Sequence, residues 1–222
     1  VPPGQTVSGM AMLGVGDTAA ALEAAETNLR ELGEPAREGY PILCTEPSAA
    51  LCIRQEYPLL LNHPDVAAVA EQTQDAGTFL LNLHRQGKLT TNFQELPLKL
   101  IYHTPCHLKA VSSQSGLLEL LQMIPGVDIE PVDRGCTGMA GTFGIAAEHF
   151  EKSLEIGAPL ISTLQTVSVS AGTTECSSCR MQMEQAVDFP TLHPIKILAL
   201  AWGLMPSHDR QMKSRPSGYL MS

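Results

Sequence analysis

Four of the six cysteines in this chain occur in an arrangement that could do chemistry: Cys106, Cys136, Cys176 and Cys179. The last two form a Cys-x-x-Cys motif. In a chain whose N-terminus shows no secretory signal segment, this motif indicates metal binding or thiol redox chemistry before a structural disulfide. Four thiolates suit zinc or an iron–sulfur cluster. We therefore predict that these four cysteines hold one metal or iron–sulfur centre.

The expected secondary structure would bring the four cysteines together. Apolar and β-branched runs predict strands at 99–104, 127–132 and 166–170, and helical patterns are expected at 106–123, within 138–164, and at 177–187. Each cysteine then follows a strand and lies at or near the start of a helix. In a parallel α/β unit such points meet at the carboxyl edge of the sheet. Helix N-termini also favour thiolates, through their free N–H groups and positive dipole end.

Glycine and histidine residues near these cysteines are further candidates. Gly135 and Gly138 flank Cys136 and would let the backbone approach a bulky ligand. His103 and His107 lie on either side of the first cysteine. Either could be a ligand, a proton carrier or a side chain bonded to local backbone, and we expect His107 to donate a hydrogen bond near the centre. Gly135, Gly138 and His107 are thus our candidate cofactor-binding residues.

Two other interpretations of the thiols remain open. The four cysteines could hold zinc, or nothing, in a structural module that serves as a docking surface. Alternatively, Cys176 and Cys179 could form a thiol–disulfide redox pair that needs no metal. The remaining cysteines, Cys44 and Cys52, are expected to be small buried apolar side chains.

An internal repeat links the two halves of the chain. Residues 8–11 (SGMA) match 137–140 (TGMA), and residues 45–48 (TEPS) match 174–177 (TECS) at the same spacing. His63-Pro64 matches His193-Pro194 one residue out of step. Such matches predict a duplicated unit.

The first copy lacks counterparts of the four candidate ligand cysteines. In the repeat alignment, three cysteines of the second copy fall on other residue types, namely Val7, Pro47 and Ala50. The counterpart of Cys106 would fall before Val1, so the first copy is expected to lack its opening strand.

The predicted fold is α/β, with two small parallel-sheet units related by approximate two-fold symmetry. In the first unit we expect a helix at 17–32, a strand at 40–44, and helices at 47–61 and 65–86. The expected domains are a degenerate first unit at 1–96 and a cysteine-bearing unit at 97–205, followed by a flexible tail at 206–222.

Composition excludes some classes of function. The formal net charge is −9, and the 14 Lys and Arg residues are scattered, so we expect no nucleic-acid partner. The longest apolar run, 197–205, is far shorter than the roughly 20 residues of a membrane-spanning helix. No transmembrane segment is therefore expected.

Three segments resemble a known family. Residues 102–108 (YHTPCHL), 133–144 (DRGCTGMAGTFG) and 175–179 (ECSSC) are similar to the cysteine-rich CCG domain. That domain occurs in iron–sulfur subunits of anaerobic glycerol-3-phosphate dehydrogenase and glycolate oxidase, and in heterodisulfide reductase. It also forms the C-terminal part of FAD-linked oxidases of the D-lactate dehydrogenase type. Residues 39–58 resemble the first half of the same tandem.

The resemblance implies a ligand set. The family pattern is a Cys, a Cys-Cys-Gly and a Cys-x-x-Cys, and it binds iron–sulfur clusters or, in some members, zinc. Here Thr137 stands where the second Cys of the pair is expected. Four thiols remain, which favours a 4Fe–4S cluster or zinc over a five-thiolate cluster.

The resemblance also implies a role. We expect a C-terminal electron-transfer domain of an iron–sulfur or FAD-linked oxidoreductase that acts on a small hydroxy acid or glycerol 3-phosphate. FAD would belong to the parent protein and not to this chain, and the domain alone should show no turnover. Expected partners are flavin and ferredoxin-type domains or subunits, with a quinone or a membrane-associated acceptor as the onward step. The expected location is cytoplasmic, or peripheral on the inner face of the membrane.

Overall fold

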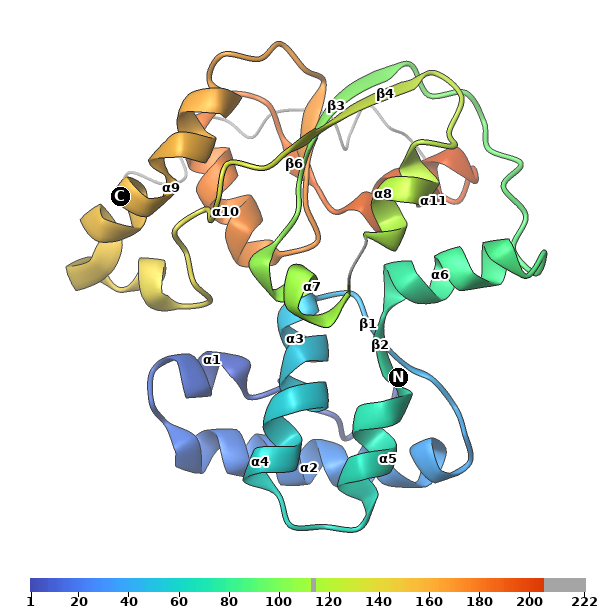
Figure 1. The fold of residues 1–222 in the computed structure, drawn as a ribbon, viewed down its shortest axis with the longest axis vertical. Helices are drawn as coiled ribbons and strands as arrows, with labels where there is room; N and C mark the ends of the chain where they lie inside the picture. The colour runs from blue at the N-terminus through green and yellow to red at the C-terminus, as the bar shows by residue number, and fades with distance from the viewer. Residues whose placement is uncertain (113–114, 206–222) are drawn as a thin grey trace.

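The computed structural model describes residues 1–112 and 115–205, so the predicted tail at 206–222 lies outside it. The described chain is an α/β structure with two parallel sheets, one of two strands and one of four. Figure 1 shows helices α1 to α5 in the lower half and the four-stranded sheet with its helices in the upper half.

Short helices and strands alternate along the chain. The strands are β1 (Ile42–Cys44), β2 (Thr73–Asp75), β3 (Leu98–His103), β4 (Val127–Val132), β5 (Ala171–Thr173) and β6 (Thr191–Leu192). The α-helices are α1 (Met10–Gly14), α2 (Thr18–Arg37), α3 (Pro47–Leu51), α4 (Tyr57–Leu60), α5 (Asp65–Gln72), α6 (Ala76–Arg85), α7 (Cys106–Val111), α8 (Gly116–Leu121), α9 (Phe150–Leu164), α10 (Ser177–Ala186) and α11 (Pro194–Ala201). A π-helical turn (Cys52–Glu56) joins α3 to α4, and 3₁₀ turns at Phe143–Ile145 and Ala147–His149 precede α9.

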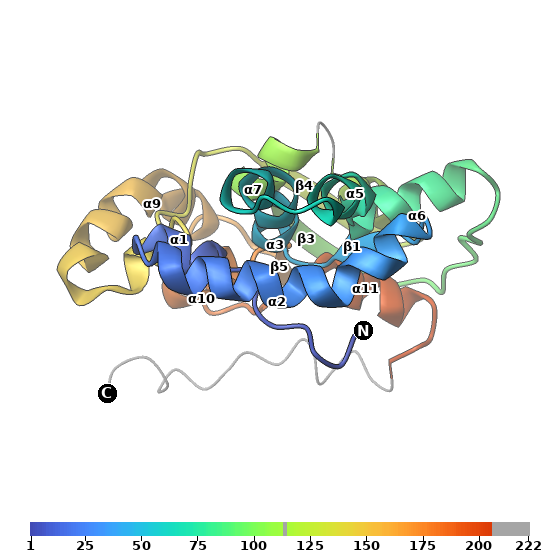
Figure 2. The ribbon, with the colours of Figure 1, turned by 90° about the horizontal axis from the view of Figure 1, so that it is seen from below.

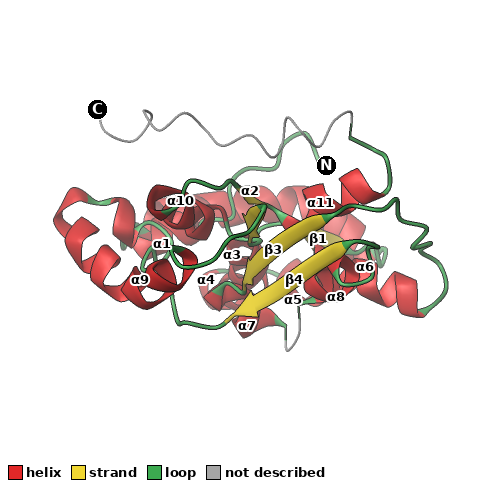
Figure 3. Ribbon diagram, turned by 90° about the horizontal axis from the view of Figure 1, so that it is seen from above, coloured by secondary structure: helices red, strands yellow, loops and turns green. Residues whose placement is uncertain are grey.

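The four-stranded sheet has the order β4-β3-β5-β6, with every pair parallel. Strand β3 is central, and five of its six residues are buried because helices cover both faces. Leu98 and Leu100 pack with α6, α8 and α11 in one core, whereas Ile101 packs with α9 and α10 in another. Figure 3 shows β3 and β4 side by side between these helices.

A separate core stabilises the lower half. Apolar side chains of α2, the α3–α4 segment and α5 pack together beside β1, among them Leu29, Tyr57 and Val69. Figure 2 shows α2 running across the molecule in the view from below. Helix α6, which follows β2, leaves this core: Leu81 belongs to the core of the four-stranded sheet.

The repeat has a structural counterpart. Strands β1 and β5 occupy matching positions in the two copies, as do α3 and α10. Gly9 and Gly138, which align in the repeat, both have a φ of +94°. His63 and His193 each accept a hydrogen bond at Nδ1 from the N–H two residues later. The sequence matches therefore reflect one local fold used twice.

Several expected elements differ from the structure. The strand expected at 166–170 lies instead at β5, because the β-branched run 166–170 forms the connection that leads into the sheet. The helix expected at 65–86 is interrupted by β2, and the helix expected at 106–123 is divided into α7 and α8. Asp75 and Ser115, the N-cap residues of α6 and α8, mark the two additional helix starts.

Within residues 1–112 and 115–205, no helix is both long enough and apolar enough to cross a bilayer.

Candidate metal centre

The sheet register brings the cysteine-bearing segments to one edge. His103, the last residue of β3, pairs with Val132, the last residue of β4. Tyr102 pairs with Thr173 at the end of β5. The segments that follow these three strands carry all four candidate cysteines, as the parallel arrangement requires.

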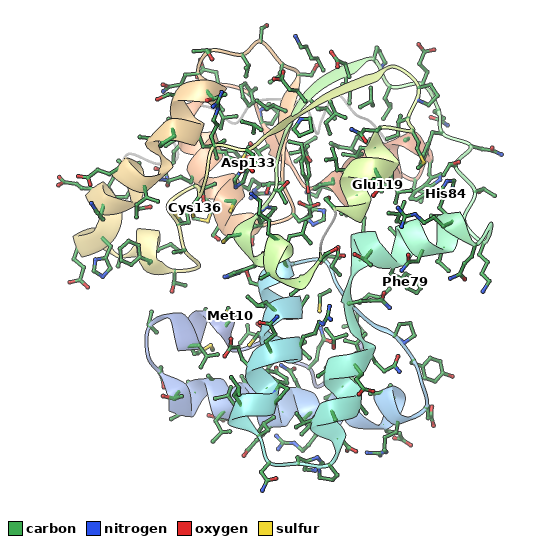
Figure 4. The ribbon with its side chains drawn as sticks, in the orientation of Figure 1. Met10, Phe79, His84, Glu119, Asp133 and Cys136 are labelled. Carbon is green, nitrogen blue, oxygen red and sulfur yellow. The ribbon has the colours of Figure 1, made fainter. Side chains whose placement is uncertain are left out.

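Cys106 and Cys136 form one thiol pair. Cys106 is the first residue of α7 and is exposed, whereas Cys136 is half-buried in the loop after β4. The Cys106 thiol donates a hydrogen bond to Cys136, and this bond lowers the pKa of Cys136 to about 5. The same bond and burial raise the pKa of Cys106. Figure 4 shows Cys136 and Asp133 in the connection that follows β4.

Cys176 and Cys179 form the second pair at the N-terminus of α10. Cys176 is the N-cap residue, and its Sγ accepts the N–H of Cys179 at 3.5 Å. Its Sγ also lies 3.2 Å from the Ser178 hydroxyl. Hydrogen bonding from the Cys179 thiol lowers the pKa of Cys176, while that bond and burial raise the pKa of Cys179.

The loop around Cys136 is shaped by positive φ angles. Gly135, Gly138 and Gly141 have φ values of +85°, +94° and +69°, and Ala140 adopts +41°. The Gly138 N–H donates to the Cys136 Sγ at 3.3 Å, and the Ala140 N–H also donates to it. Successive backbone N–H groups in such conformations form an anion-binding concavity. The loop therefore presents donors to a thiolate.

Cys136 departs from the expectation in one respect. We expected all four cysteines at or near helix starts, but Cys136 lies in a loop, and the next helical turn begins at Phe143. Backbone N–H groups of the loop donate hydrogen bonds to Cys136, as an N–H group at the start of α10 does to Cys176.

The two pairs are neighbours but do not converge on one point. Cys106 interacts electrostatically with both Cys176 and Cys179. Within residues 1–112 and 115–205, however, no three His, Cys, Asp or Glu side chains form a group that could hold a metal ion. A single zinc ion needs four ligand atoms about 2.3 Å from one centre. The arrangement is thus two adjacent thiol pairs.

The residue expected to replace a family cysteine also faces the thiols. Thr137 is buried, and its hydroxyl donates to the Cys179 Sγ at 3.4 Å. At the position of the second family cysteine, the Thr137 hydroxyl is therefore a hydrogen-bond donor to a thiol and not a thiolate ligand.

The two histidines have different surroundings. Burial lowers the pKa of His103 to about 4, and its Nδ1 has no hydrogen-bond partner among the described residues. His107 is half-buried, and its Nδ1 lies 2.8 Å from the Ser48 hydroxyl of the first unit. This hydrogen bond joins His107 to the other copy rather than to a thiol.

A buried carboxylate beside the centre was not recognised as such from sequence. Glu175 accepts hydrogen bonds from the Tyr102 hydroxyl at 2.7 Å and the Ser115 hydroxyl at 3.1 Å. Helix α10 is capped by Cys176 and not by Glu175, and burial raises the pKa of Glu175 to about 7. The sequence signal for this buried carboxylate was the position of Glu175 between the end of β5 and Cys176.

The chemistry of the donor set fits a thiolate-bound group. Four sulfur atoms lie in two adjacent pairs, and backbone N–H groups point at Cys136 and Cys176. Such N–H groups stabilise thiolate ligands and tune an iron–sulfur potential. By contrast, a cavity of about 720 Å³ between α2 and the connection from α4 to α5 includes none of the candidate residues.

Residues 100–184 match the family model described as a cysteine-rich domain, CCG. This part of the chain is a CCG domain. The CCG domain contains β3, β4, β5 and all four candidate cysteines.

Curated proteins extend the similarity beyond the CCG domain. The chain is 34% identical over 194 residues to a subunit of anaerobic glycerol-3-phosphate dehydrogenase from Escherichia coli strain K12, and equally to that of E. coli O157:H7. It is 26% identical over 171 residues to a D-2-hydroxyglutarate dehydrogenase from Pantoea ananatis. Both relatives are dehydrogenases or parts of one by name.

The coverage is unequal. The match to the glycerol-3-phosphate dehydrogenase protein includes 87% of this chain but 48% of the E. coli sequence, so the chain spans about half the length of that relative. It spans 16% of the Pantoea protein. One relative is a subunit of a dehydrogenase, and the other is a much longer dehydrogenase.

Proposed function

We propose that this chain is an electron-transfer domain of an oxidoreductase and that its four CCG-domain cysteines hold an iron–sulfur cluster. The observation that carries the proposal is the meeting of two thiol pairs at the carboxyl edge of one sheet, with backbone N–H donors at two of the sulfur atoms. The parent enzyme would act on glycerol 3-phosphate or a small hydroxy acid. That substrate class follows from the names of the relatives.

Each part of the site has a role in this proposal. Cys106, Cys136, Cys176 and Cys179 would be the ligands, and a bound cluster would supply one-electron redox chemistry. The N–H groups of Gly138 and Ala140 donate to one sulfur and would favour its thiolate form. The helix N-terminus does the same for Cys176.

The proposed partners follow from the same role. Flavin and ferredoxin-type domains or subunits of the parent enzyme would deliver electrons, and a quinone or a membrane-associated protein would accept them. The proposed location is cytoplasmic or peripheral on the inner face of the membrane. Exposure of Cys106 supports electron exchange with a partner, because its edge of the centre is open to the surface.

A thiol–disulfide function is the second candidate. Cys176 and Cys179 are hydrogen-bonded, and the pKa of Cys176 is lowered, as in thiol redox pairs. Both side chains are buried, however, which limits access by a protein disulfide. A structural zinc site would use the same four thiols, and redox activity separates it from the cluster because zinc has none.

Metal and sulfide analysis tests the proposal. The protein should be purified without oxygen and assayed for iron, acid-labile sulfide, zinc and visible absorption. We expect iron and sulfide in similar amounts with a broad visible band. Cys136→Ser and Cys176→Ser should each lose most of the iron, whereas Cys44→Ser, at a cysteine outside the candidate ligand set, should retain it.

Each other result has a clear meaning. Stoichiometric zinc without colour would establish the structural module. Absence of both metals, with Cys176 and Cys179 cycling between thiol and disulfide, would favour thiol redox chemistry. In that case Cys106→Ser should leave the cycling intact.

A further inference from the structure

The first unit reaches the cysteine centre through Glu46. The Glu46 carboxylate accepts two hydrogen bonds at Oε2, from the Ser177 N–H at 3.0 Å and from the Ser177 hydroxyl at 2.6 Å. Ser177 is the first residue of α10 and directly follows Cys176. A carboxylate from the first copy, which carries none of the four candidate ligands, therefore binds the turn that carries half of them.

Two neighbouring contacts fix this segment of the first unit. The Ser48 hydroxyl lies 2.8 Å from His107 Nδ1, next to Cys106. The Thr45 carbonyl oxygen accepts a hydrogen bond from His193 Nε2 at 2.9 Å. In Figure 1, α3 begins just below α7, in agreement with these contacts.

The tautomer of His193 supports the third contact. Its Nδ1 accepts the Ile195 N–H at 3.1 Å, so the ring proton lies on Nε2 and points toward the Thr45 carbonyl. The His193 contact thus has a defined donor and acceptor.

The position of Glu46 matters because the start of α10 has free N–H groups. The first N–H groups of a helix have no partner within it and carry partial positive charge. Cys176 takes the Cys179 N–H, and Glu46 takes the Ser177 N–H. A thiolate and a carboxylate therefore share one helix end.

The repeat explains how one motif serves two purposes. Glu46 and Glu175 occupy matching positions, yet Glu175 points into its own unit toward Tyr102, whereas Glu46 crosses to the other unit. The first copy has this segment without the thiols. In the first copy, the Glu46 carboxylate instead binds a residue of the neighbouring copy.

We propose that Glu46 is a positioning residue for the cysteine centre, holding the Cys176–Cys179 turn and placing a negative charge beside it. The first unit is then part of the centre, and a CCG domain without it would be incomplete. The effect on redox potential rests on the proposed function, whereas the effect on the turn does not. Negative charge near an iron–sulfur centre disfavours its reduction.

Three variants separate the two effects. Glu46→Gln keeps an oxygen that can accept from Ser177 but removes the charge, and Glu46→Ala removes both. Glu38→Gln is the matched control. Glu38 is exposed at the end of α2, so this substitution removes the same charge at a position away from the site.

The first measurement uses the full chain without metal and with reduced thiols. Amide hydrogen exchange at Ser177, followed by NMR, should be about tenfold faster in Glu46→Ala, equal to about 1.4 kcal/mol and typical of one hydrogen bond. Glu46→Gln and Glu38→Gln should stay within about threefold of the wild type. Unchanged exchange in Glu46→Ala would overturn the positioning role.

The second measurement uses the iron-loaded chain. In Glu46→Gln the reduction potential should rise, so that the ratio of reduced to oxidised centre at a fixed potential increases about threefold or more. Glu38→Gln should match the wild type. An unchanged potential in Glu46→Gln would overturn the charge effect.

The two measurements also distinguish this proposal from the proposed function. If no iron–sulfur centre assembles but exchange responds to Glu46→Ala, the function fails and the positioning role stands. If the centre assembles and neither measurement responds, the positioning role fails and the function stands.

Discussion

At the scale of single residues, burial and hydrogen bonding decide what each polar side chain near the centre can do. Glu175 and Tyr102 are both buried, and the carboxylate receives two hydroxyl donors. Burial still dominates and raises the pKa of Glu175 to about 7. The carboxyl group therefore stays protonated in the folded chain at pH values where it is ionised in the unfolded chain.

This difference predicts a pH-dependent stability. The folded state holds the proton more tightly, so Glu175 contributes stability below pH 4.5, and that contribution is lost as the pH rises through 7. Replacing Glu175 by Gln removes the titration. We compare the free energy of unfolding of Glu175→Gln with that of the wild type at each pH. The variant minus wild-type difference should be higher at pH 8 than at pH 5, by up to about 3 kcal/mol.

Urea unfolding of both metal-free proteins at the two pH values measures this change. The titration of His103 is present in both proteins and cancels in the difference. A difference that is constant with pH would show that the Glu175 pKa is not raised.

Gly138 supports a second prediction at this scale. A Cβ there would collide with the Ser153 carbonyl oxygen of α9, and the φ of +94° is unfavourable for any other residue. Gly138→Ala should therefore lower the free energy of unfolding by about 3 kcal/mol or more. Gly141→Ala is the control: it has a similar φ but nothing within 4 Å of the new Cβ, and should lose only about 1 kcal/mol. Equal losses would show that the contact with α9 is unimportant.

At the scale of elements, the close crossing of α6 and α8 attaches residues before β3 to the four-stranded sheet. A Cβ at Gly116 would meet the Gly77 carbonyl oxygen, so the two backbones are in contact. Leu117 and Leu81 lie beside this crossing in the same core. The contact is available only because both positions lack a side chain.

We predict that Gly116→Ala separates α6 from α8. The free energy of unfolding should fall by about 1–3 kcal/mol, as in other overpacked interiors. Gly14→Ala is the control, because the new Cβ would approach only the Thr142 hydroxyl, at 3.3 Å, and alanine favours a helix. Urea unfolding measures both variants. A loss in Gly14→Ala as large as in Gly116→Ala would contradict the crossing as the cause.

At the scale of the whole molecule, contacts between the copies predict one cooperative unit. Helix α6 packs on the four-stranded sheet, and Glu46 and Ser48 bind residues of the other copy. The single tryptophan, Trp202, packs on Phe93 with ring centroids 5.3 Å apart. Its fluorescence therefore reports on the second copy and the segment before it.

We predict that a cavity in the first copy shifts the unfolding of the second. Leu29→Ala, in the core of α2, should lower the free energy of unfolding by about 2–4 kcal/mol. The midpoints from Trp202 fluorescence and from far-UV circular dichroism should move together. Separate midpoints would show that the copies unfold independently.

Sequence alone determined the local features of this protein. The spacing of Cys106, Cys136, Cys176 and Cys179, together with strand patterns at β3 and β4, predicted an α/β fold with thiols at strand ends, because side-chain type and short-range periodicity are local properties. The repeat was visible for the same reason. The metal ligation and domain boundaries inferred from those features remain predictions.

Tertiary structure decided what each local feature contacts. It placed β2 within an apparent helix, and it paired Cys106 with Cys136 and Cys176 with Cys179. It also directed Glu46 across to Ser177, while its repeat partner Glu175 remained inside its own unit. Similar local sequence gave different roles here because hydrogen bonds and burial depend on neighbours far away in the chain, which no local pattern specifies.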